Sequence, residues 1–250
     1  FSLELMGSPE SFLLTLGISG VSSLLQIVSC AFAGYGFARF SFKFRGLLFA
    51  GMLFTIIVPP QTYIIPLYMQ YRFFDFFGLG SLLGLVSGTK FSVNMINSVF
   101  TFYLPALLAS GIRSGLFIFI FAQFFRGMPR ELEDAACIDG YGFMGTFTRI
   151  FIPNSLPAFL TVFFFSFVWY WNDYFFTSMF FTSVNTLSTA LTSIRSAYTS
   201  QIADADSTNI FRYAVTEQAG ALLSIGPVLV MYILLQRHFT ESIERTGIVG

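Results

Sequence analysis

The sequence predicts an all-α integral membrane protein that crosses the bilayer as a bundle of about five helices. Of its 250 residues, 55% are hydrophobic and only 10% are charged, and the mean hydropathy is +0.72. A soluble domain carries roughly 25% charged residues, so lipid must surround much of this chain. Long apolar runs without charge recur along it, and about 20 such residues cross the hydrocarbon core as a helix.

The charged and reactive residues exclude several functions. The 13 basic and 13 acidic residues cancel, so no overall positive field indicates nucleic-acid binding. His238 is the only histidine, which excludes a catalytic histidine pair, and the cysteines Cys30 and Cys137 are too few for a disulfide scaffold. We therefore predict no catalytic residues and no metal site in this chain.

The first two spans are predicted at residues 12–38 and 46–71. The first contains no ionisable group, carries many small residues that let neighbouring helices approach closely, and stops at Arg39. Pro59 and the proline after it interrupt the second span. Because proline lacks a helical N–H donor, we expect this helix to kink or to end around Val58.

The rest of the chain supplies three further spans. Residues 72–103 mix apolar, glycine and polar residues, and we expect a loop with short interfacial helical pieces there. A long stretch rich in Ser, Thr, Asn and Asp, residues 182–212, separates the last two spans. The remaining spans are predicted at 104–125, 153–177 and 217–236.

Basic residues near the ends of the spans set the topology, because short cytoplasmic loops carry an excess of Lys and Arg. Most of the basic residues fall on one side of the predicted bundle: Arg39, Lys43, Arg45, Arg126, Arg130, Arg149, Arg237 and Arg245. We therefore place the 39–45 loop, the 126–149 loop and the C-terminus in the cytoplasm. Residues 182–212 are expected outside the cell, and so is Phe1.

The charge-dense segment after the third span predicts a compact helical lobe. Pro129 stands where a helix start is expected, and three acidic residues follow within the first turn, where the helix dipole favours them. Gly140 permits a sharp turn, and a second short helical piece leads to Pro153. This helix–Gly–helix shape suits seating in a groove of another protein; the alternative is an ordinary amphipathic loop.

The spacing of the lobe residues resembles a known motif. Asp134-Ala-Ala-(x)3-Gly140-(x)9-Ile150-x-Ile152-Pro153 is similar to the EAA loop of ABC-importer permeases, E-A-A-x3-G-x9-I-x-L-P. Asp134 replaces the Glu, and Ile152 replaces the Leu. The resemblance implies that residues 126–152 couple this chain to a cytoplasmic ATPase, through Glu133, Asp134, Ala135, Ala136, Asp139, Gly140, Ile150 and Pro153.

Further motifs occur along nearly the whole chain. They are Gly34-Tyr35-Gly36-Phe37-Ala38-Arg39, Val58-Pro59, Ile65-Pro66-Leu67-Tyr68, Trp171-Asn172-Asp173 and Gln236-Arg237-His238-Phe239. These motifs resemble those of the maltose-type second permease of the carbohydrate family. Departures occur in the tail, where Glu244-Arg245-Thr246 replaces a small, glycine-containing stretch and Val249 stands where Lys is common.

This resemblance implies a multi-pass protein of the bacterial inner (cytoplasmic) membrane with several partners. They are a second permease subunit, two ATPase subunits and an extracytoplasmic sugar-binding protein. No G-x4-G-K-[ST] sequence is present, so the chain is expected to be no enzyme and to hold no cofactor, with ATP and Mg²⁺ in the partner ATPase. Family members have six spans, so the resemblance implies that the first is missing here.

Two features are candidates for contact with a transported sugar. Trp171, Asn172 and Asp173 offer a stacking face and hydrogen-bonding groups near the outer half of the fourth span; the alternative is a helix-end cap with an interfacial aromatic anchor. Arg113 in the third span should face a cavity or a partner; its alternative place is an outer loop.

Three rival functions remain open. The EAA loop is shared by ABC importers of amino acids and metals, although the Trp-Asn-Asp triplet and the tail favour sugar. A proton-coupled secondary transporter would need a titratable relay in its spans, where only Asp173 and Arg113 are available. A structural or receptor-like subunit is disfavoured by the glycine- and proline-broken helices.

Overall fold

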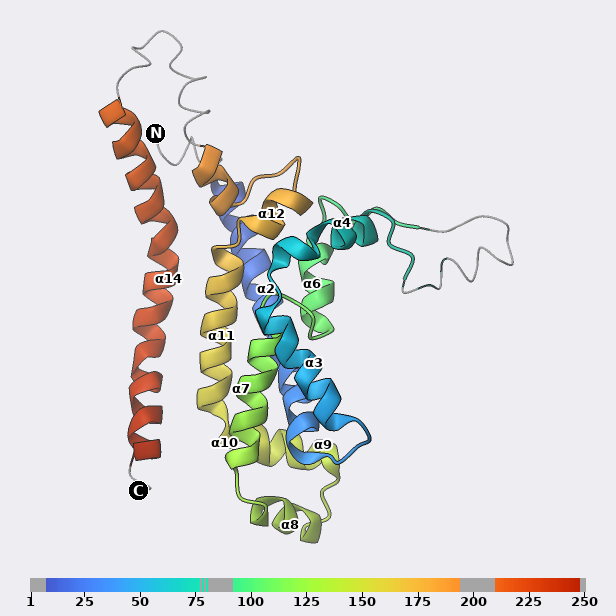
Figure 1. Ribbon diagram of the computed structural model, residues 1–250. Coiled ribbons are helices and arrows are strands. Elements are labelled where there is room, and N and C mark those ends of the chain that lie inside the picture. Colours follow the sequence, from blue (N-terminus) through green and yellow to red (C-terminus); the bar gives the residue numbers. More distant parts are fainter. Residues whose placement is uncertain (1–7, 77, 79, 81–91, 194–209, 248–250) are drawn as a thin grey trace. The chain divides into compact units, whose positions relative to one another are not determined.

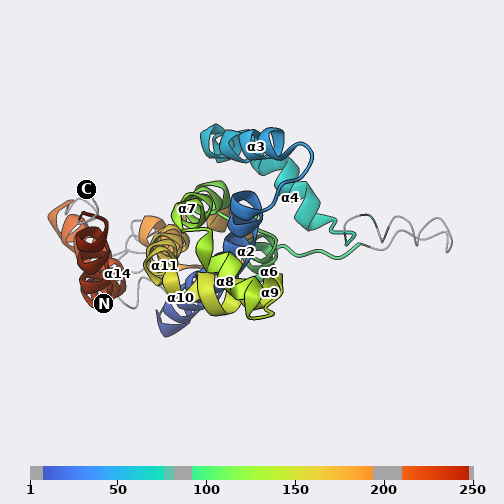
Figure 2. The ribbon, with the colours of Figure 1, turned by 90° about the horizontal axis from the view of Figure 1, so that it is seen from below.

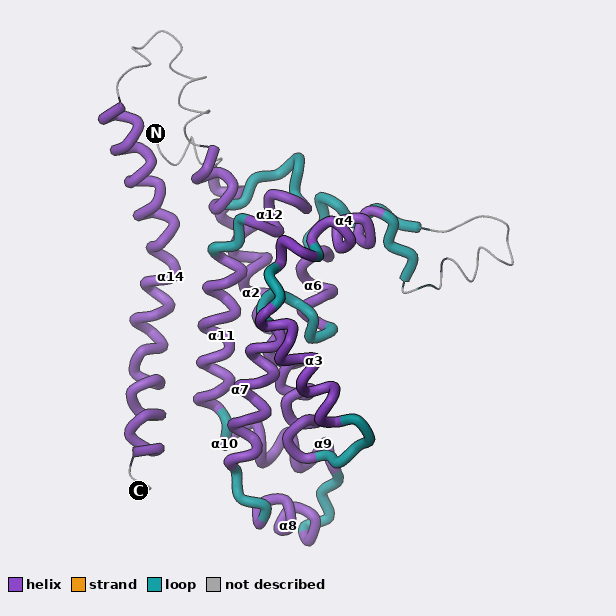
Figure 3. Tube along the Cα trace, in the orientation of Figure 1, coloured by secondary structure: helices purple, strands orange, loops and turns teal. Residues whose placement is uncertain are grey.

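The computed structural model describes residues 8–76, 78, 80, 92–193 and 210–247. Within these ranges the regular structure is helical, as the composition predicts, and no strand is formed (Figure 3). A single isolated bridge pairs Phe74 with Val93. Parts of the predicted 72–103 loop and of the polar stretch 182–212 lie outside the described residues.

The chain divides into two compact units. The first comprises Phe1–Ile18, Val58–Leu104 and Trp171–Ser224, and the second comprises Ser19–Ile57, Pro105–Tyr170 and Ile225–Gly250. Several helices continue from one unit into the other along the chain.

Helices α2, α3, α7 and α11 form the body of the second unit (Figure 1). Close backbone approach joins α2 to α7, since a Cβ atom on Gly34 would lie 2.6 Å from Cβ of Phe121. Gly115 allows α3 to approach α7 in the same way, because its Cβ would lie 2.9 Å from the Met52 carbonyl oxygen. The bounds are α2 Ser8–Arg39, α3 Arg45–Ile57, α7 Ser114–Gly127 and α11 Leu156–Trp171.

Short helices follow α7 at one end of this unit. They are α8 (Glu131–Ile138), α9 (Phe143–Thr146), the π-helical segment η2 (Phe147–Phe151) and α10 (Ile152–Asn154). Viewed from below, α8 and α9 lie next to the end of α2 (Figure 2).

The chain turns sharply where α10 meets α11. Residues Phe143–Asn154 and Leu156–Trp171 are bent by 78° at this break. Pro157 has no N–H to continue the helix and would clash with the carbonyl group four residues earlier. The Phe151 carbonyl oxygen accepts both the Ser155 N–H, at 3.0 Å, and the buried Ser155 hydroxyl, so the backbone stays hydrogen-bonded up to the break.

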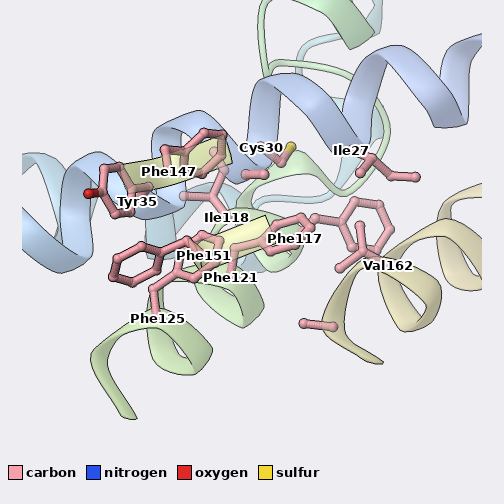
Figure 4. Close-up of a cluster of buried hydrophobic side chains, with 12 residues drawn as sticks. Ile27, Cys30, Tyr35, Phe117, Ile118, Phe121, Phe125, Phe147, Phe151 and Val162 are labelled. Atoms are coloured by element: carbon pink, nitrogen blue, oxygen red, sulfur yellow. The ribbon is translucent and has the colours of Figure 1, made fainter. Parts of the chain in front are cut away.

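Aromatic side chains fill the core of the second unit (Figure 4). Phe117, Phe121 and Phe125 project from successive turns of α7, and each is fully buried. The core joins α2, α7, η2 and α11 through Ile27, Cys30, Ala31, Tyr35, Phe117, Ile118, Phe121, Phe125, Phe147, Phe151, Ala158 and Val162.

The first unit is built from shorter helices. Phe102 stacks on Phe181, and Phe180 packs edge-on to Tyr71, with ring centroids 5.8 and 5.2 Å apart respectively. These contacts join α4 and α6 to α12. The bounds are η1 Pro60–Thr62, α4 Ile64–Arg72, α6 Phe100–Leu107 and α12 Phe175–Phe180.

Two described helices, Pro9–Arg39 and Ala214–Arg237, are long and apolar enough to cross a membrane. The bent pair that ends at Trp171 raises the number to three if it acts as one span, and α3 and α7 are apolar but shorter. Ala214–Arg237 belongs to α14 (Ile210–Gly247), which continues through Pro227. Membrane-spanning helices are therefore present.

Three of the predicted spans are interrupted in the structure. The range 153–177 is broken between α10 and α11, and it ends as a helix at Trp171. Helix α3 ends at Ile57, which confirms the effect expected from the prolines that follow. The range 104–125 is not one helix, because α6 ends at Leu107 and α7 begins at Ser114. Arg113 between them adopts a left-handed conformation with φ of 58°, and this backbone cannot continue a right-handed helix.

Candidate functional site

The lobe, residues 129–153, begins with an acidic helix. Helix α8 starts at Glu131, and its first turn also contains Glu133 and Asp134. Carboxylates in this position interact favourably with the free N–H groups at the positive end of the helix. The sequence therefore places three acidic residues together where they also stabilise the helix.

Gly140 ends α8 in a Schellman motif. Its φ is +79°, and its N–H donates to the Cys137 carbonyl oxygen at 3.1 Å. The N–H of Tyr141 donates to the Ala136 carbonyl oxygen at 2.9 Å, which completes the pair of bonds that defines this motif. The left-handed conformation favours glycine here, and it turns the chain towards α9.

An aromatic cluster holds the second half of the lobe against α2. The Tyr35 ring lies 5.3 Å from that of Phe143, 5.0 Å from Phe147 and 4.7 Å from Phe151, measured between centroids. Tilted and edge-on pairs at these distances stabilise aromatic packing. Because Phe125 of α7 also packs edge-on to Tyr35 at 5.9 Å, a displacement of α9 and η2 would be felt by both α2 and α7.

Arg39 ties the first half of the lobe to the same two helices. Its Nη2 atom donates to the carbonyl oxygens of Phe125 and Met128, at 2.7 and 2.6 Å, which lie at the end of α7. Its Nε lies 3.1 Å from Oε1 of Glu133 in α8. The guanidinium thus stabilises carbonyl groups at a helix C-terminus and pairs with Glu133 of the lobe.

The outer surface of the lobe is apolar between acidic residues. Asp134, Ala135 and Asp139 are exposed, whereas Ala136 faces inward and is buried. Ile138 is 86% exposed, the largest exposed fraction among the large hydrophobic residues that the structure describes. Phe143 and Met144 are exposed as well. Apolar residues rimmed by charge on a protein surface are typical of a protein–protein contact.

The remaining lobe positions lead back to the membrane helices. Ile150 is partly buried against the aromatic core, and Pro153 is exposed in α10. The lobe therefore brings together all the residues that the motif selected, over the short helices α8 to α10.

Trp171 is buried rather than presented to a cavity. It is only 2% exposed, its indole N–H donates to the Ser224 carbonyl oxygen at 2.9 Å, and Phe12 packs edge-on to it at 5.7 Å. Asn172 is exposed. In this structure Trp171 is therefore a packed residue of the first unit.

Asp173 caps α12. Its carboxylate accepts hydrogen bonds from the backbone N–H groups of Phe176 and Thr177, at 3.3 and 2.8 Å, and from the Thr177 hydroxyl at 2.8 Å. These N–H groups lack helical partners because they lie in the first turn. Local helix chemistry accounts for this carboxylate without a ligand.

Arg113 is exposed and precedes α7 instead of lying within a helix. Its guanidinium carbon lies 4.6 Å from the centroid of the Trp169 ring, within the range of a cation–π interaction. Trp169 is 41% exposed, so the tryptophan with an accessible ring is Trp169 and not Trp171.

Sequence reasoning did not select Arg39, Tyr35 or Trp169 as site residues. Arg39 and Tyr35 belong to a motif at the end of the first span, which indicated that they matter but not what they contact. Trp169 carried no such signal, because a tryptophan near a helix end is common at membrane interfaces.

Three comparisons bear on these features. Residues 30–244 match the family model described as "Binding-protein-dependent transport system inner membrane component". The chain is 30% identical over 171 residues to "Alpha-glucoside transport system permease protein AglG" of Rhizobium meliloti (strain 1021), which covers 68% of this chain and 40% of that protein. It is 28% identical over 244 residues to "Melibiose/raffinose/stachyose import permease protein MelC" of Bacillus subtilis (strain 168), covering 96% of this chain and 76% of that protein.

The fold is also similar to a chain from the crystal structure of a bacterial ABC transporter involved in the import of the acidic polysaccharide alginate. The TM-score is 0.60 and the identity 17%, over 95% of this chain and 78% of that one. At this identity the similarity concerns the fold alone.

Proposed function

Because this chain belongs to the family of binding-protein-dependent transport system inner membrane components, we propose that it forms, with a second permease subunit, the carbohydrate pathway of an ABC importer. The relatives' names support the substrate class, since AglG is named for alpha-glucosides and MelC for melibiose, raffinose and stachyose. These sugars differ, so the support extends to carbohydrates as a class.

The connection of the lobe to the ends of α2 and α7 is the observation that carries the coupling part of the proposal. Two ATPase subunits bind and hydrolyse ATP with Mg²⁺ in the cytoplasm, and the exposed apolar face around Ile138 seats in one of them. Movement of that subunit reaches α2 and α7 through the Arg39–Glu133 ion pair and through the aromatic contacts of Tyr35. An extracytoplasmic binding protein delivers the sugar on the opposite side.

We further propose five membrane crossings in this chain. They are supplied by α2, by α3, by the α6–α7 segment, by the bent segment that contains α11, and by α14. The lobe, the 39–45 loop and the C-terminal tail then lie in the cytoplasm, consistent with the crowding of basic residues there.

Purification from native membranes tests the proposal. An affinity tag on this chain should recover a second permease and an ATPase, and the complex in lipid vesicles should import sugar when ATP is supplied at the lobe side. Uptake driven by a proton gradient without an ATPase would support a secondary transporter instead. Import of an amino acid or a metal ion in place of sugar would overturn only the substrate class.

The exposed position of Ile138 gives a sharper version of this test. Ile138→Glu places a charge on the apolar face, and binding of the ATPase would have to remove water from this charge. The ATPase should therefore no longer purify with the tagged chain, while the two permeases still purify together. Ile138→Val keeps the face apolar and serves as the matched control. Retention of the ATPase by Ile138→Glu at the wild-type ratio would count against the lobe as the docking face.

A further inference from the structure

The break between α6 and α7 is held by side chains from two other helices. The Gln26 amide donates to the Ile112 carbonyl oxygen at 2.7 Å, and the Tyr170 hydroxyl accepts the Ile112 N–H at 3.3 Å. The Ser29 hydroxyl donates to the Ala106 carbonyl oxygen at 2.6 Å. Non-helical backbone within a membrane requires such partners, and it is tolerated where it is buried in protein or lines a water-filled cavity.

Gln26 is the centre of this arrangement. It is fully buried, its amide also donates to the Ser114 hydroxyl, and its carbonyl oxygen accepts from the Ser166 hydroxyl, both at 2.8 Å. Both donor hydrogens and the acceptor of the side chain are thus used. One residue of α2 therefore fixes the break relative to the start of α7 and to α11.

The fixed break holds Arg113 in a strained conformation. A non-glycine residue with φ of 58° costs roughly 1–2 kcal/mol relative to an ordinary backbone, and such strain persists where the surroundings impose it. Its guanidinium lies on the Trp169 ring and both residues are exposed. None of the carboxylates that the structure describes forms an ion pair with it.

Arg113 is also far along the chain from the other charges of its unit. Helix α7 has 14 residues and is about 21 Å long, against a hydrocarbon core of about 30 Å. In the topology proposed above, Gly127 lies at the cytoplasmic surface, so Arg113, about 21 Å away along α7, falls inside the hydrocarbon core. The other described charges of its unit lie at residues 39–45, 126–149 and 237–245, which are at or beyond the C-terminal ends of α2 and α7 or in the last part of α14.

A lone arginine inside a span faces water or a functional partner, and arginines that line a membrane pathway select anions. Building on the proposed carbohydrate pathway, we propose that Arg113 and Trp169 form a subsite in it for a sugar that carries an acidic group. The guanidinium fork pairs with the carboxylate of the sugar, and the exposed part of the indole packs on the C–H face of the ring. Gln26 is a positioning residue for this pair.

The test uses the complete importer with its binding protein, reconstituted in phosphatidylcholine vesicles with ATP. The probes are a mixture of acidic oligosaccharides from polygalacturonate and neutral oligosaccharides from starch, and the vesicle contents are identified by mass spectrometry. Wild-type vesicles should accumulate the acidic sugars. Arg113→Gln should lower their uptake about tenfold, the factor that corresponds to 1.4 kcal/mol, and Arg113→Lys, which keeps the charge but loses the planar fork, should retain only part of it.

Arg126→Gln is the matched control, because Arg126 also lies over an aromatic ring, that of Phe49 at 4.7 Å, but at the other end of α7. It should leave the ratio of acidic to neutral uptake unchanged. Trp169→Ala, compared with Trp169→Phe, is a second variant if Arg113→Gln fails to co-purify with its partners. Acidic uptake should fall with Ala and be largely kept with Phe.

Three results would overturn the subsite. They are failure of the acidic sugars to enter wild-type vesicles, wild-type acidic uptake by both Arg113→Gln and Trp169→Ala, and an effect of Arg113→Gln only in vesicles that contain anionic lipid. The last result would assign the arginine to a lipid headgroup. ATP-dependent uptake of neutral sugars alone would overturn the subsite while leaving the proposed function in place, whereas no ATP-dependent uptake of either class would count against both.

Discussion

The Nε atom of Arg39 lies 3.1 Å from Oε1 of Glu133, and this ion pair joins the last turn of α2 to the first turn of α8. The two side chains are 7% and 28% exposed. The Nε–H does not point at the carboxylate as a hydrogen bond would require, so the contact is a charge pair without a directed bond. Arg39 keeps its geometry through its bonds to the α7 carbonyl groups.

Removing either partner of this pair should weaken the coupling of ATP hydrolysis to sugar uptake. The two changes should lower the stability of the complex by different amounts. Arg39→Gln removes the pair and the bonds to two α7 carbonyl oxygens, and we expect it to cost about 3 kcal/mol. Glu133→Gln leaves those bonds intact and should cost about 1–2 kcal/mol. Sugar uptake per ATP hydrolysed by the reconstituted complex, and its thermal stability, measure the two effects.

The double variant should be less destabilised than the sum of the single variants, because each single change already removes the pair. Glu131→Gln, an exposed acid in the same turn, is the control and should behave as wild type. Full additivity of the two changes would show that Arg39 and Glu133 do not interact energetically.

Replacing Gly140 should abolish transport without affecting insertion into the membrane. A Cβ atom at this position meets nothing within 4 Å, but φ is +79°, so Val is strained by the backbone alone. Asn adopts this conformation more readily, and Gly140→Asn should retain much of the uptake. A Cβ atom on Gly142 also meets nothing within 4 Å, but φ there is −74°, so Gly142→Val is the control. Normal uptake by Gly140→Val would contradict the prediction.

The native cysteines report the topology of the lobe. Cys137 is exposed on α8, and Cys30 is buried. A membrane-impermeant thiol reagent should therefore label Cys137 in inside-out vesicles but not in intact cells, and Cys137→Ser should remove the signal. Labelling of Cys137 in intact cells would invert the orientation proposed above.

A single cysteine in place of Ser200 should behave in the opposite way. This residue lies outside the described part of the structure, within the 182–212 stretch that the sequence places on the outer side. In a chain without Cys30 and Cys137, Ser200→Cys should be labelled in intact cells, and Ser242→Cys only in inside-out vesicles.

The two tryptophans should respond differently to truncation. Trp171→Ala empties a buried site and should cost about 3–5 kcal/mol, so less permease should assemble with its partners. Trp169→Ala removes an exposed ring and should leave assembly close to normal. Co-purified partner per tagged chain distinguishes them, and normal assembly of Trp171→Ala with reduced uptake would restore a pathway role for Trp171.

Loss of the Gln26 hydrogen bonds should destabilise the complex. Gln26→Leu keeps the size of the side chain but leaves the Ile112 carbonyl oxygen and the hydroxyls of Ser114 and Ser166 without this partner. Unsatisfied buried groups cost about 1–3 kcal/mol each, and we expect a loss of about 2–4 kcal/mol in thermal unfolding. Gln123→Leu, at an exposed position on α7, should change stability little. Equal effects of the two changes would show that the Gln26 hydrogen bonds do not stabilise the break between α6 and α7.

Much of the lobe could be predicted because its features are local in the chain. A proline before the helix, acids in its first turn and a glycine after its last turn are read from neighbouring residues, and they predict α8 and its end at Gly140 correctly. The helix break near Val58 followed from proline chemistry in the same way. The sequence left open whether Arg113 lies within the third span or in a loop. The structure places it between α6 and α7, and the side chains of Gln26, Ser29 and Tyr170, distant in sequence, hydrogen-bond the backbone of this break.

The sequence by itself determined the membrane class, the helical fold and the position of the lobe, since these depend on hydropathy, local propensity and spacing along one segment. Only the tertiary structure decided which side chains meet across segments: Arg39 with Glu133, Tyr35 with the aromatic residues of the lobe, and Arg113 with Trp169. It also separated the two tryptophans, one buried and one exposed, although they stand two positions apart in one helix. The physical reason is that burial and pairing depend on which helices approach that face, and this information is spread over segments far apart in the chain.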